Sequence, residues 1–162
     1  MINVKWTWTK GSYLCVMKEQ IMSEIVIQAP LAAVWKVLAD FANYPNWSPT
    51  IQQFEGIPEE GKQTKVWLQQ PGGTRIKMNP TFLRIAKEQE IRWKGKLFLA
   101  GLFDGEHYFV LKPLANGQIL LIQGELFSGI LVPFLRKMIK GNTLAGFDLF
   151  NQALKKEVER SL

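Results

Sequence analysis

The residues best suited to chemistry in this sequence are its only histidine, His107, and the carboxylate of Glu125. Both lie in alternating runs that predict strands, EHYFVLKP and QILLIQGELF, and alternate residues of a strand face the same side. If residues 115–117 form a three-residue loop with Gly117 in the left-handed region, His107 stands opposite Glu125 and Phe109 opposite Gln123. A two-residue Asn-Gly turn would shift this register by one residue. We favour the longer loop because it brings the two faces of mixed polarity together.

A carboxylate that orients and charges an imidazole forms a pair able to move a substrate proton, so His107 and Glu125 are candidate catalytic residues. Two other interpretations compete with catalysis. The pair could be a buried polar anchor in an apolar pocket, each group satisfied by its neighbour. Alternatively, His107 could lie at the rim of its strand, partly in water. Because the sequence identifies no nucleophile and no oxyanion hole beside the pair, we expect binding, with an enzyme as the alternative.

The sequence contains no recognisable motif for binding a metal or a cofactor. One histidine and one cysteine, Cys15, give no cluster with metal-ligand spacing, and GGTRIK lacks the frame of a Walker-type loop. We therefore predict neither a metal nor a cofactor. The lone cysteine cannot close an intrachain disulfide, the N-terminus lacks a signal-peptide pattern, and no apolar run approaches the roughly 18–20 residues of a membrane span. We expect one domain in the cytoplasm.

The elements that must position the pair can be followed from Glu24 onward. EIVIQ predicts a strand, PLAAVWKVLADF predicts a helix opened by Pro30, and NYPNWSP predicts a short helical turn. Six strands then follow, with connections too short for crossover helices, which indicates a single antiparallel meander with a turn at residues 70–73. These strands are TIQQFEG, TKVWLQ, TRIKMNPTFLRIAKEQ, EIRWKGKL, EHYFVLKP and QILLIQGELF.

The apolar period changes after Pro133. The segment PFLRKMIKGNTLAGFDLFNQALKKEVERSL has a broad apolar face and predicts a long amphipathic helix able to cover a sheet. Gly141 and Gly146 each cost a helix about 1 kcal/mol relative to alanine. Small residues there could bend the helix or leave room beside it. A curved antiparallel sheet on such a helix usually encloses a cavity.

Residues 1–22 show scattered aromatic residues and no sustained period. Either translation begins at Met17 or Met22, or these residues form an extra strand or a flexible arm. We place the domain at residues 23–160 and treat residues 1–22 as an N-terminal extension.

The order of elements and several local motifs resemble the START-like (SRPBCC) superfamily, and within it the polyketide cyclase/dehydrase branch. The resemblance is carried by EIVIQAPLAAVWKVLADFANYPNWSP, LRIAKEQEIRWKGKL, GLFDGEHYF, ELFSGILVP and AGFDLFNQALK. It implies an α+β helix-grip fold, in which a curved antiparallel sheet wraps around a long C-terminal helix, with two short helices after the first strand and an internal cavity. It also implies a small hydrophobic ligand (lipid, quinone or polyketide-like), bound by a carrier or sensor. A few such proteins cyclise or dehydrate polyketides, which is the alternative for the His107–Glu125 pair.

Alternation within EIRWKGKL sends Trp93 toward the cavity and the cations Arg92, Lys94 and Lys96 toward solvent. An aromatic interior with a few polar groups suits a flat or greasy ligand, although any single aromatic residue could simply fill the core. The predicted ligand-binding residues are Trp47, Trp93, Phe103, His107, Phe109, Gln123, Glu125, Phe127, Phe147 and Phe150.

Two apolar loops, residues 97–103 and 127–134, could gate the cavity with Gly101 and Gly129 as hinges, or could simply cap the core. Basic residues follow the second loop at positions 136, 137 and 140, which suits transient contact with an anionic membrane surface. With a net charge of +6, a basic stripe beside Trp67 could also bind nucleic acid, but a solvated outer face explains it better. The basic stripe comprises Lys65, Arg75, Lys77, Arg92, Lys94 and Lys96.

The sequence does not determine the oligomeric state.

Overall fold

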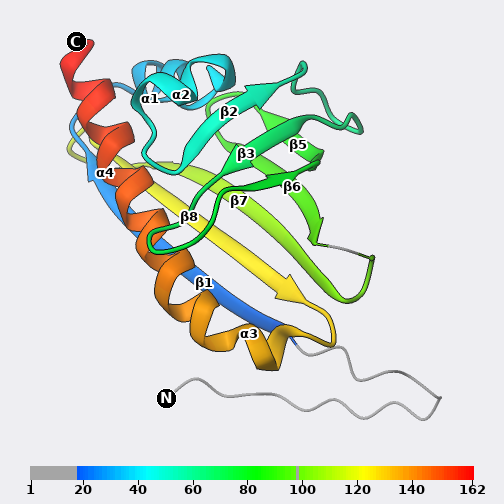
Figure 1. Cartoon of the computed structure of the whole chain (residues 1–162). Helices are drawn as coiled ribbons and strands as arrows, with labels where there is room; N and C mark the ends of the chain where they lie inside the picture. Colours follow the sequence, from blue (N-terminus) through cyan, green and yellow to red (C-terminus); the bar gives the residue numbers. More distant parts are fainter. Residues whose placement is uncertain (1–17, 98) are drawn as a thin grey trace, which may run out of the picture.

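The computed structural model describes residues 18–97 and 99–162, which form two antiparallel sheets and a long C-terminal helix (Figure 1). The main sheet has five strands in the order β1-β8-β7-β6-β5, and the smaller sheet has three in the order β2-β3-β4. The strands are β1 (Lys18–Ile27), β2 (Ile51–Glu55), β3 (Lys65–Leu68), β4 (Ile76–Met78), β5 (Thr81–Ala86), β6 (Glu90–Leu97), β7 (Phe103–Pro113) and β8 (Ile119–Ser128).

The helices fall into two groups. Between β1 and β2 lie α1 (Leu31–Leu38), the 3-10 turn η1 (Phe41–Asn43) and the short α2 (Tyr44–Trp47). After β8 comes one uninterrupted helical segment made of α3 (Val132–Met138), the π-helical turn η2 (Ile139–Thr143) and α4 (Leu144–Arg160). Helix α4 packs across the main sheet over β1 and β8 (Figure 1). This is the predicted α+β helix-grip fold.

The single six-strand meander expected from the sequence is wrong. The run TRIKMNPTFLRIAKEQ forms two strands, β4 and β5, because Pro80 has no backbone N–H to donate to a ladder and the chain leaves the small sheet there. Seven strands therefore follow the short helices, and they divide between two sheets. The small sheet lies over the β5–β6 side of the main sheet, where β4 contacts β6 (Figure 1).

Strand β1 begins before the predicted start at Glu24. Residues Lys18 to Met22 pair in register with Ser128 to Gly124 of β8, and the side chain of Ile21 is buried. Met22 thus lies inside a paired strand, whereas Met17 lies outside the described residues.

Polar contacts fix α4 onto β1. The Ser23 hydroxyl donates to Asp148 at 2.5 Å and accepts from the Asn151 amide at 3.1 Å. Lys155 donates to the carbonyl of Val26 at 2.9 Å. These contacts hold the helix over the edge of the main sheet that carries the chain's first strand.

Both glycines of the C-terminal helix have structural consequences. Gly141 lies in the π-helical turn η2, where the helix departs from regular α geometry. Gly146 is buried, and a Cβ atom added to it would overlap the side-chain oxygen of Gln70, which comes from the turn between β3 and β4. Gly146 therefore leaves room for a side chain of the small sheet beside α4. The turn between β3 and β4 is the one predicted at residues 70–73. It is closed by a 2.9 Å hydrogen bond from Gly73 N–H to Gln70 O.

The register of β7 and β8 is the one predicted. His107 pairs with Glu125, and Phe109 pairs with Gln123. The connection closes with hydrogen bonds between Leu114 and Gln118 (2.8 Å) and from Gly117 N–H to Leu114 O (3.0 Å), with Gly117 at φ 80°. The three-residue loop therefore sets which side chains of the two strands stand together.

Candidate functional site

A cavity of about 350 Å³ lies between the main sheet, the small sheet and the C-terminal helix. Its wall is mainly apolar, and its volume is within the range of about 300–1,000 Å³ that is typical of ligand pockets. Nine of the ten predicted ligand-binding residues line it: Trp93, Phe103, His107, Phe109, Gln123, Glu125, Phe127, Phe147 and Phe150.

The tenth predicted residue, Trp47, is not part of the wall. Its ring packs with centroid distances of 5.0 Å against both Tyr44 and Phe150, which do line the cavity. Trp47 is thus one layer removed from the cavity, because those two rings stand at the wall itself.

Sequence reasoning missed the side of the cavity formed by the small sheet. Strand alternation assigned these residues to the same meander as β5–β8, so nothing indicated that they fold back over it. Gln70 and Thr143 were missed as well, since neither lies in a strand with a recognisable pattern. The unpredicted lining residues include Phe54, Val66, Leu68, Gln70, Ile76, Met78 and Thr143.

His107 is buried among aromatic rings, with 8% of its surface exposed, so the interpretation as a wet rim residue is wrong. Its ring stacks on Trp93 at 4.7 Å with an interplanar angle of 11°. Phe109 and Phe147 meet it edge-on at 4.9 and 5.0 Å. The imidazole is therefore held in one orientation by packing.

Both ring nitrogens of His107 face protein groups. Nδ1 lies 3.5 Å from Glu125 Oε2, and Nε2 lies 3.2 Å from the amide nitrogen of Gln123. When the Gln123 amide donates to Nε2, the imidazole proton resides on Nδ1, toward Glu125. A ligand would have to displace one of these partners to exchange a proton with His107, whereas the Glu125 carboxylate retains a second oxygen.

Two amide oxygens in the cavity wall are buried with no hydrogen-bond partner among the described residues: Gln123 Oε1 and Gln70 Oε1. Leaving a buried acceptor unpaired costs about 1–3 kcal/mol, so such atoms are uncommon in a finished core. Here they mark positions where a molecule that carries hydrogen-bond donors would be stabilised.

The cavity meets the surface between the small sheet, the end of β6 and the helical turn η2. The lining residues there are exposed: Thr74, Ile76, Lys96, Met138 and Asn142. Of the two loops expected to gate the cavity, the described lining residues include only Phe103 and Phe127. Both belong to a second core cluster with Val132, Ile139 and Phe147. Leu99, Ile130 and Phe134 of the same two loops are exposed, and gating of the cavity by these loops stays a prediction.

The chain matches a known protein family over most of its length. Residues 18–159 match the family described as polyketide cyclase / dehydrase and lipid transport. The chain belongs to this family. No curated protein sequence matches the chain at a significant level.

Solved structures share the family fold at low sequence identity. The Zhui aromatase/cyclase from Streptomyces sp. R1128 aligns with a TM-score of 0.73 and 17% identity, covering 89% of this chain and 95% of that one. Norcoclaurine synthase from Thalictrum flavum, a point mutant in complex with a transition-state analogue, gives 0.72 and 15%, covering 92% and 99%. A START superfamily protein from Mycobacterium smegmatis gives 0.67 and 20%, covering 88% and 99%. At these identities the likeness establishes the fold alone.

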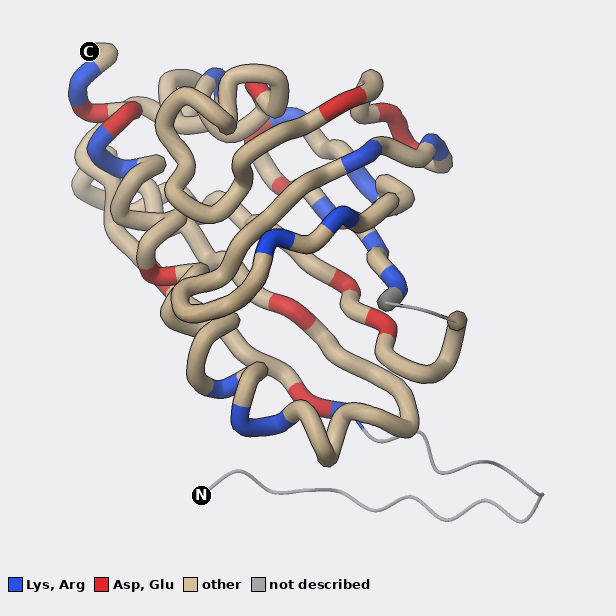
Figure 2. The backbone as a smooth tube through the Cα atoms, viewed as in Figure 1, with Lys and Arg blue, Asp and Glu red and all other residues tan. Residues whose placement is uncertain are grey.

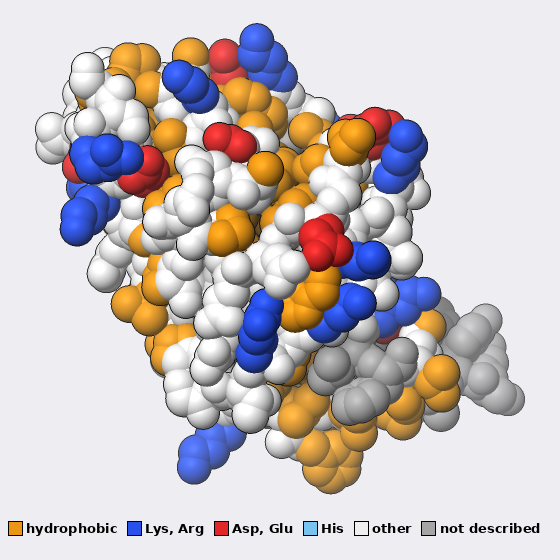
Figure 3. Space-filling view, turned by 45° about the horizontal axis from the view of Figure 1, so that its top comes forward, with side chains coloured by type: hydrophobic (Ala, Val, Ile, Leu, Met, Phe, Trp, Pro, Cys, Tyr) orange, Lys and Arg blue, Asp and Glu red, His pale blue; other side chains and the backbone are white. Residues whose placement is uncertain are grey.

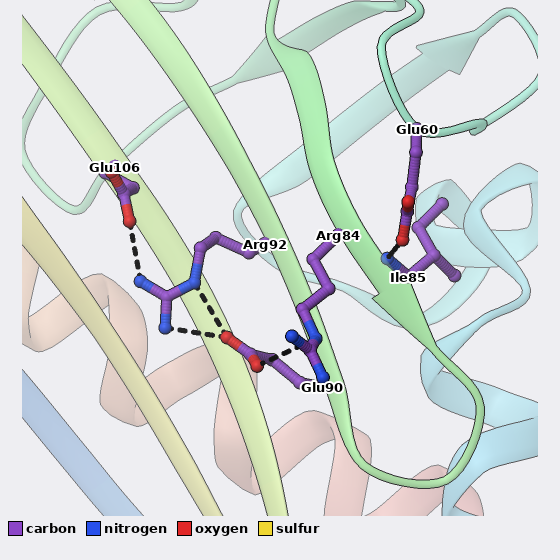
Figure 4. A network of polar contacts seen from close by, with 6 residues as sticks. All are labelled: Glu60, Arg84, Ile85, Glu90, Arg92 and Glu106. Carbon is purple, nitrogen blue, oxygen red and sulfur yellow. Dashed lines mark hydrogen bonds and ion pairs between the residues drawn. The ribbon is translucent and has the colours of Figure 1, made fainter.

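The outer face of this family member's main sheet carries a chain of ion pairs (Figure 4). Arg92 donates to Glu106 at 2.6 Å and to Glu90 at 2.7 Å, while Arg84 lies 3.3 Å from Glu90. Burial alone would lower the pKa of Arg92, but its hydrogen bonds to Glu106 and Glu90 outweigh that effect and raise it.

The predicted basic stripe is not continuous. Lys65, Arg75 and Lys77 belong to the small sheet and the turn before β4, whereas Arg92, Lys94 and Lys96 lie on β6 of the main sheet. Carboxylates also lie within ion-pair distance of Lys65, Arg92 and Lys94. This outer face is a salt-bridged, solvated surface.

Metal ligands do not gather anywhere in the described residues, where no group of three His, Cys, Asp or Glu side chains could hold an ion. None of the helices in residues 18–97 and 99–162 combines the length and apolar character needed to cross a membrane.

Proposed function

We propose that this family member binds one small hydrophobic molecule in the cavity, as a carrier or sensor. The observation that carries the proposal is the pairing of an apolar, aromatic wall with two acceptors, Gln123 Oε1 and Gln70 Oε1, that have no hydrogen-bond partner in the described part of the chain. Binding buries the apolar part of the ligand, and the acceptors fix its orientation.

The wall also constrains the chemistry of the ligand. Trp93, Phe109 and Phe150 offer ring faces and edges for a flat molecule. The amide acceptors and the Glu125 carboxylate favour a ligand with hydroxyl donors. Among lipid, quinone and polyketide-like molecules, this favours a hydroxylated aromatic, polyketide-like compound or a reduced quinol over a quinone or a plain acyl chain.

The test is native mass spectrometry of the purified protein, followed by denaturing extraction and identification of any molecule it carries. Leu68→Trp fills the cavity from the small sheet, and Leu83→Trp is the matched control because Leu83 is exposed on β5 and does not line the cavity. We expect the bound mass in the wild type and in Leu83→Trp but not in Leu68→Trp. A ligand retained equally by both variants, or none taken up from a panel of hydroxylated aromatics, would contradict the proposal.

A second candidate function is a cyclase- or dehydratase-like reaction with His107 and Glu125 as an acid/base pair. It is supported by their burial and by the 3.5 Å separation of Nδ1 and Oε2. Since both nitrogens of His107 already have partners, Glu125 is the group better placed to exchange a proton with a substrate, with His107 positioning it.

The extracted molecule separates the two functions. If His107→Ala keeps the affinity for it but abolishes its conversion to a product, the chain is an enzyme. If His107→Ala only weakens binding, and the wild type releases the molecule unchanged, the carrier function stands. Glu125→Gln serves as the companion variant, because it keeps the shape of the side chain while removing its charge.

A further inference from the structure

We propose that the end of the molecule where β8 leads into α3 docks onto an anionic lipid membrane surface. The docking surface consists of Leu99, Ile130 and Phe134 together with the basic residues Arg136, Lys137 and Lys140. The three apolar side chains are 73%, 39% and 81% exposed. Figure 3 shows hydrophobic side chains gathered at the lower end of the molecule, where α3 lies in Figure 1.

The exposed side chains lie on two loops that are hydrogen-bonded to each other. Backbone N–H groups of Ile130 and Leu131 donate to the carbonyls of Gly101 and Leu102 at 3.2 and 3.0 Å, so the two loops lie side by side. Gly129 makes this approach possible: its φ is 135°, and a Cβ atom there would overlap the carbonyl of Leu102.

The exposure of Phe134 is a property of its position on α3. Two residues earlier, Val132 is completely buried in the second core cluster, and Leu135 packs against the same cluster. The helix thus has a buried face that is already filled, and Phe134 stands on the opposite face. Burial of the exposed Phe134 ring against a partner would therefore be energetically favourable.

The charges beside these residues indicate which partner. Arg136 and Lys140 share a single carboxylate, Glu19, at 2.8 and 3.3 Å, and Lys137 has no ion-pair partner among the described residues. These three basic residues therefore carry more positive charge than Glu19 neutralises. Figure 2 places the basic residues of α3 and η2 at this same end of the molecule. Apolar anchors flanked by lysine and arginine match the interface of a membrane with anionic lipids.

The docking surface is continuous with the rim of the cavity. Met138 lies one helical turn after Phe134, on the same face of α3, and it is both 40% exposed and part of the cavity lining. A molecule leaving the cavity at this rim would pass directly onto the apolar part of the docking surface. This last step rests on the proposed function, whereas docking itself does not.

The test is sedimentation of the full chain with vesicles of phosphatidylcholine, with and without phosphatidylglycerol. We expect binding to the anionic vesicles that weakens as salt rises. Phe134→Ser should reduce the partition coefficient about tenfold or more, because it removes the exposed aromatic side chain that the membrane would bury. Lys137→Glu should reduce it by a similar factor, about tenfold, because it reverses a charge near the surface.

Matched controls make comparable changes elsewhere: an exposed apolar residue becomes serine, and an exposed lysine becomes glutamate. Ile57→Ser alters an apolar side chain that is 72% exposed in the loop between β2 and β3, and Lys112→Glu alters an exposed lysine at the far end of β7 from the docking surface. Both should bind vesicles nearly as well as the wild type. Because Phe134 and Lys137 are exposed, their variants should keep the wild-type melting temperature.

Three results would overturn the proposal. The first is no sedimentation with anionic vesicles at low salt, and the second is an equal loss in the control variants. The third is a wild-type dimer that Phe134→Ser converts to a monomer, which would make this surface an interface between copies of the chain. Native mass spectrometry of the vesicle-binding variants reports cavity occupancy independently, so failure of docking and failure of the proposed function are distinguishable.

Discussion

Replacing Gly146 with alanine should affect stability to an extent that depends on the residue at position 70. In the wild type, the new Cβ would overlap Gln70 Oε1 and lie 2.7 Å from Gln70 Cδ, so the amide must leave its position between α4 and the cavity. The next nearest atom also belongs to Gln70, at 3.4 Å. In a Gln70→Ala background those atoms are absent, and alanine is accommodated without displacement.

The expected magnitudes follow from two opposing effects. Alanine in the interior of a helix is favoured over glycine by about 1 kcal/mol. Extra volume in a packed site costs about 1–3 kcal/mol, and displacement of the flexible end of Gln70 into the cavity lies at the low end of this range. In the wild type, Gly146→Ala should therefore leave the free energy of unfolding nearly unchanged, within about 1 kcal/mol. In the Gln70→Ala background the same change should raise it by about 1 kcal/mol. The coupling energy between the two positions should be about 1 kcal/mol.

Urea unfolding of the four proteins, followed by far-UV circular dichroism, measures this cycle. Gly141→Ala is the control, because nothing lies within 4 Å of its added Cβ, and its effect should not depend on position 70. The reasoning is refuted if Gly146→Ala stabilises both backgrounds equally. The displaced amide should also enter the cavity, so Gly146→Ala should weaken ligand binding in the wild-type background.

Two further predictions concern the core and the first strand. Burial, and secondarily the charge of Asp40, raise the pKa of Tyr44 well above its ordinary value, so its contribution to stability is complete below about pH 10 and is lost as pH rises toward the folded-state pKa. Tyr44→Phe should reduce the fall in the free energy of unfolding between pH 9 and 11. Near neutral pH it should lower the free energy of unfolding by about 1 kcal/mol, because the hydrogen bond from Tyr44 to Leu38 O is lost. Identical slopes against pH in the two proteins would contradict this. A chain that begins at Met22 loses part of β1 and the buried Ile21. Its free energy of unfolding should be at least about 2 kcal/mol lower than that of a chain that begins at Met17. Equal urea midpoints would show that these residues add no stability.

Local patterns in the sequence predicted the parts of the site that depend on neighbouring strands. Alternation and loop length were sufficient to place His107 opposite Glu125, because a three-residue loop fixes the register of a hairpin. The same alternation indicated that Trp93 faces inward, and it lines the cavity. The family resemblance added the helix-grip arrangement, which periodicity alone does not determine.

The unpredicted parts depend on contacts between segments distant in sequence. The break at Pro80 turns the chain from one sheet to the other, and only then can β4 contact β6 and close the cavity. The position of Trp47 behind Tyr44 and Phe150 likewise depends on how α2 packs against α4. Single-sequence patterns carry no information on either arrangement.

The pairing of β1 with β8 also has a consequence for the order of folding. Ile27 pairs with Ile119 and Lys18 with Ser128, so the first strand must wait for a segment synthesised about a hundred residues later. The hairpins β5–β6, β6–β7 and β7–β8 can form from neighbouring segments as the chain emerges. During synthesis, β1 would remain without its strand partner until β8 emerges, and α4, which covers β1, emerges after β8. The nascent chain therefore exposes the apolar face of β1 until β8 and α4 have been synthesised, and the cavity is completed only after α4 has emerged.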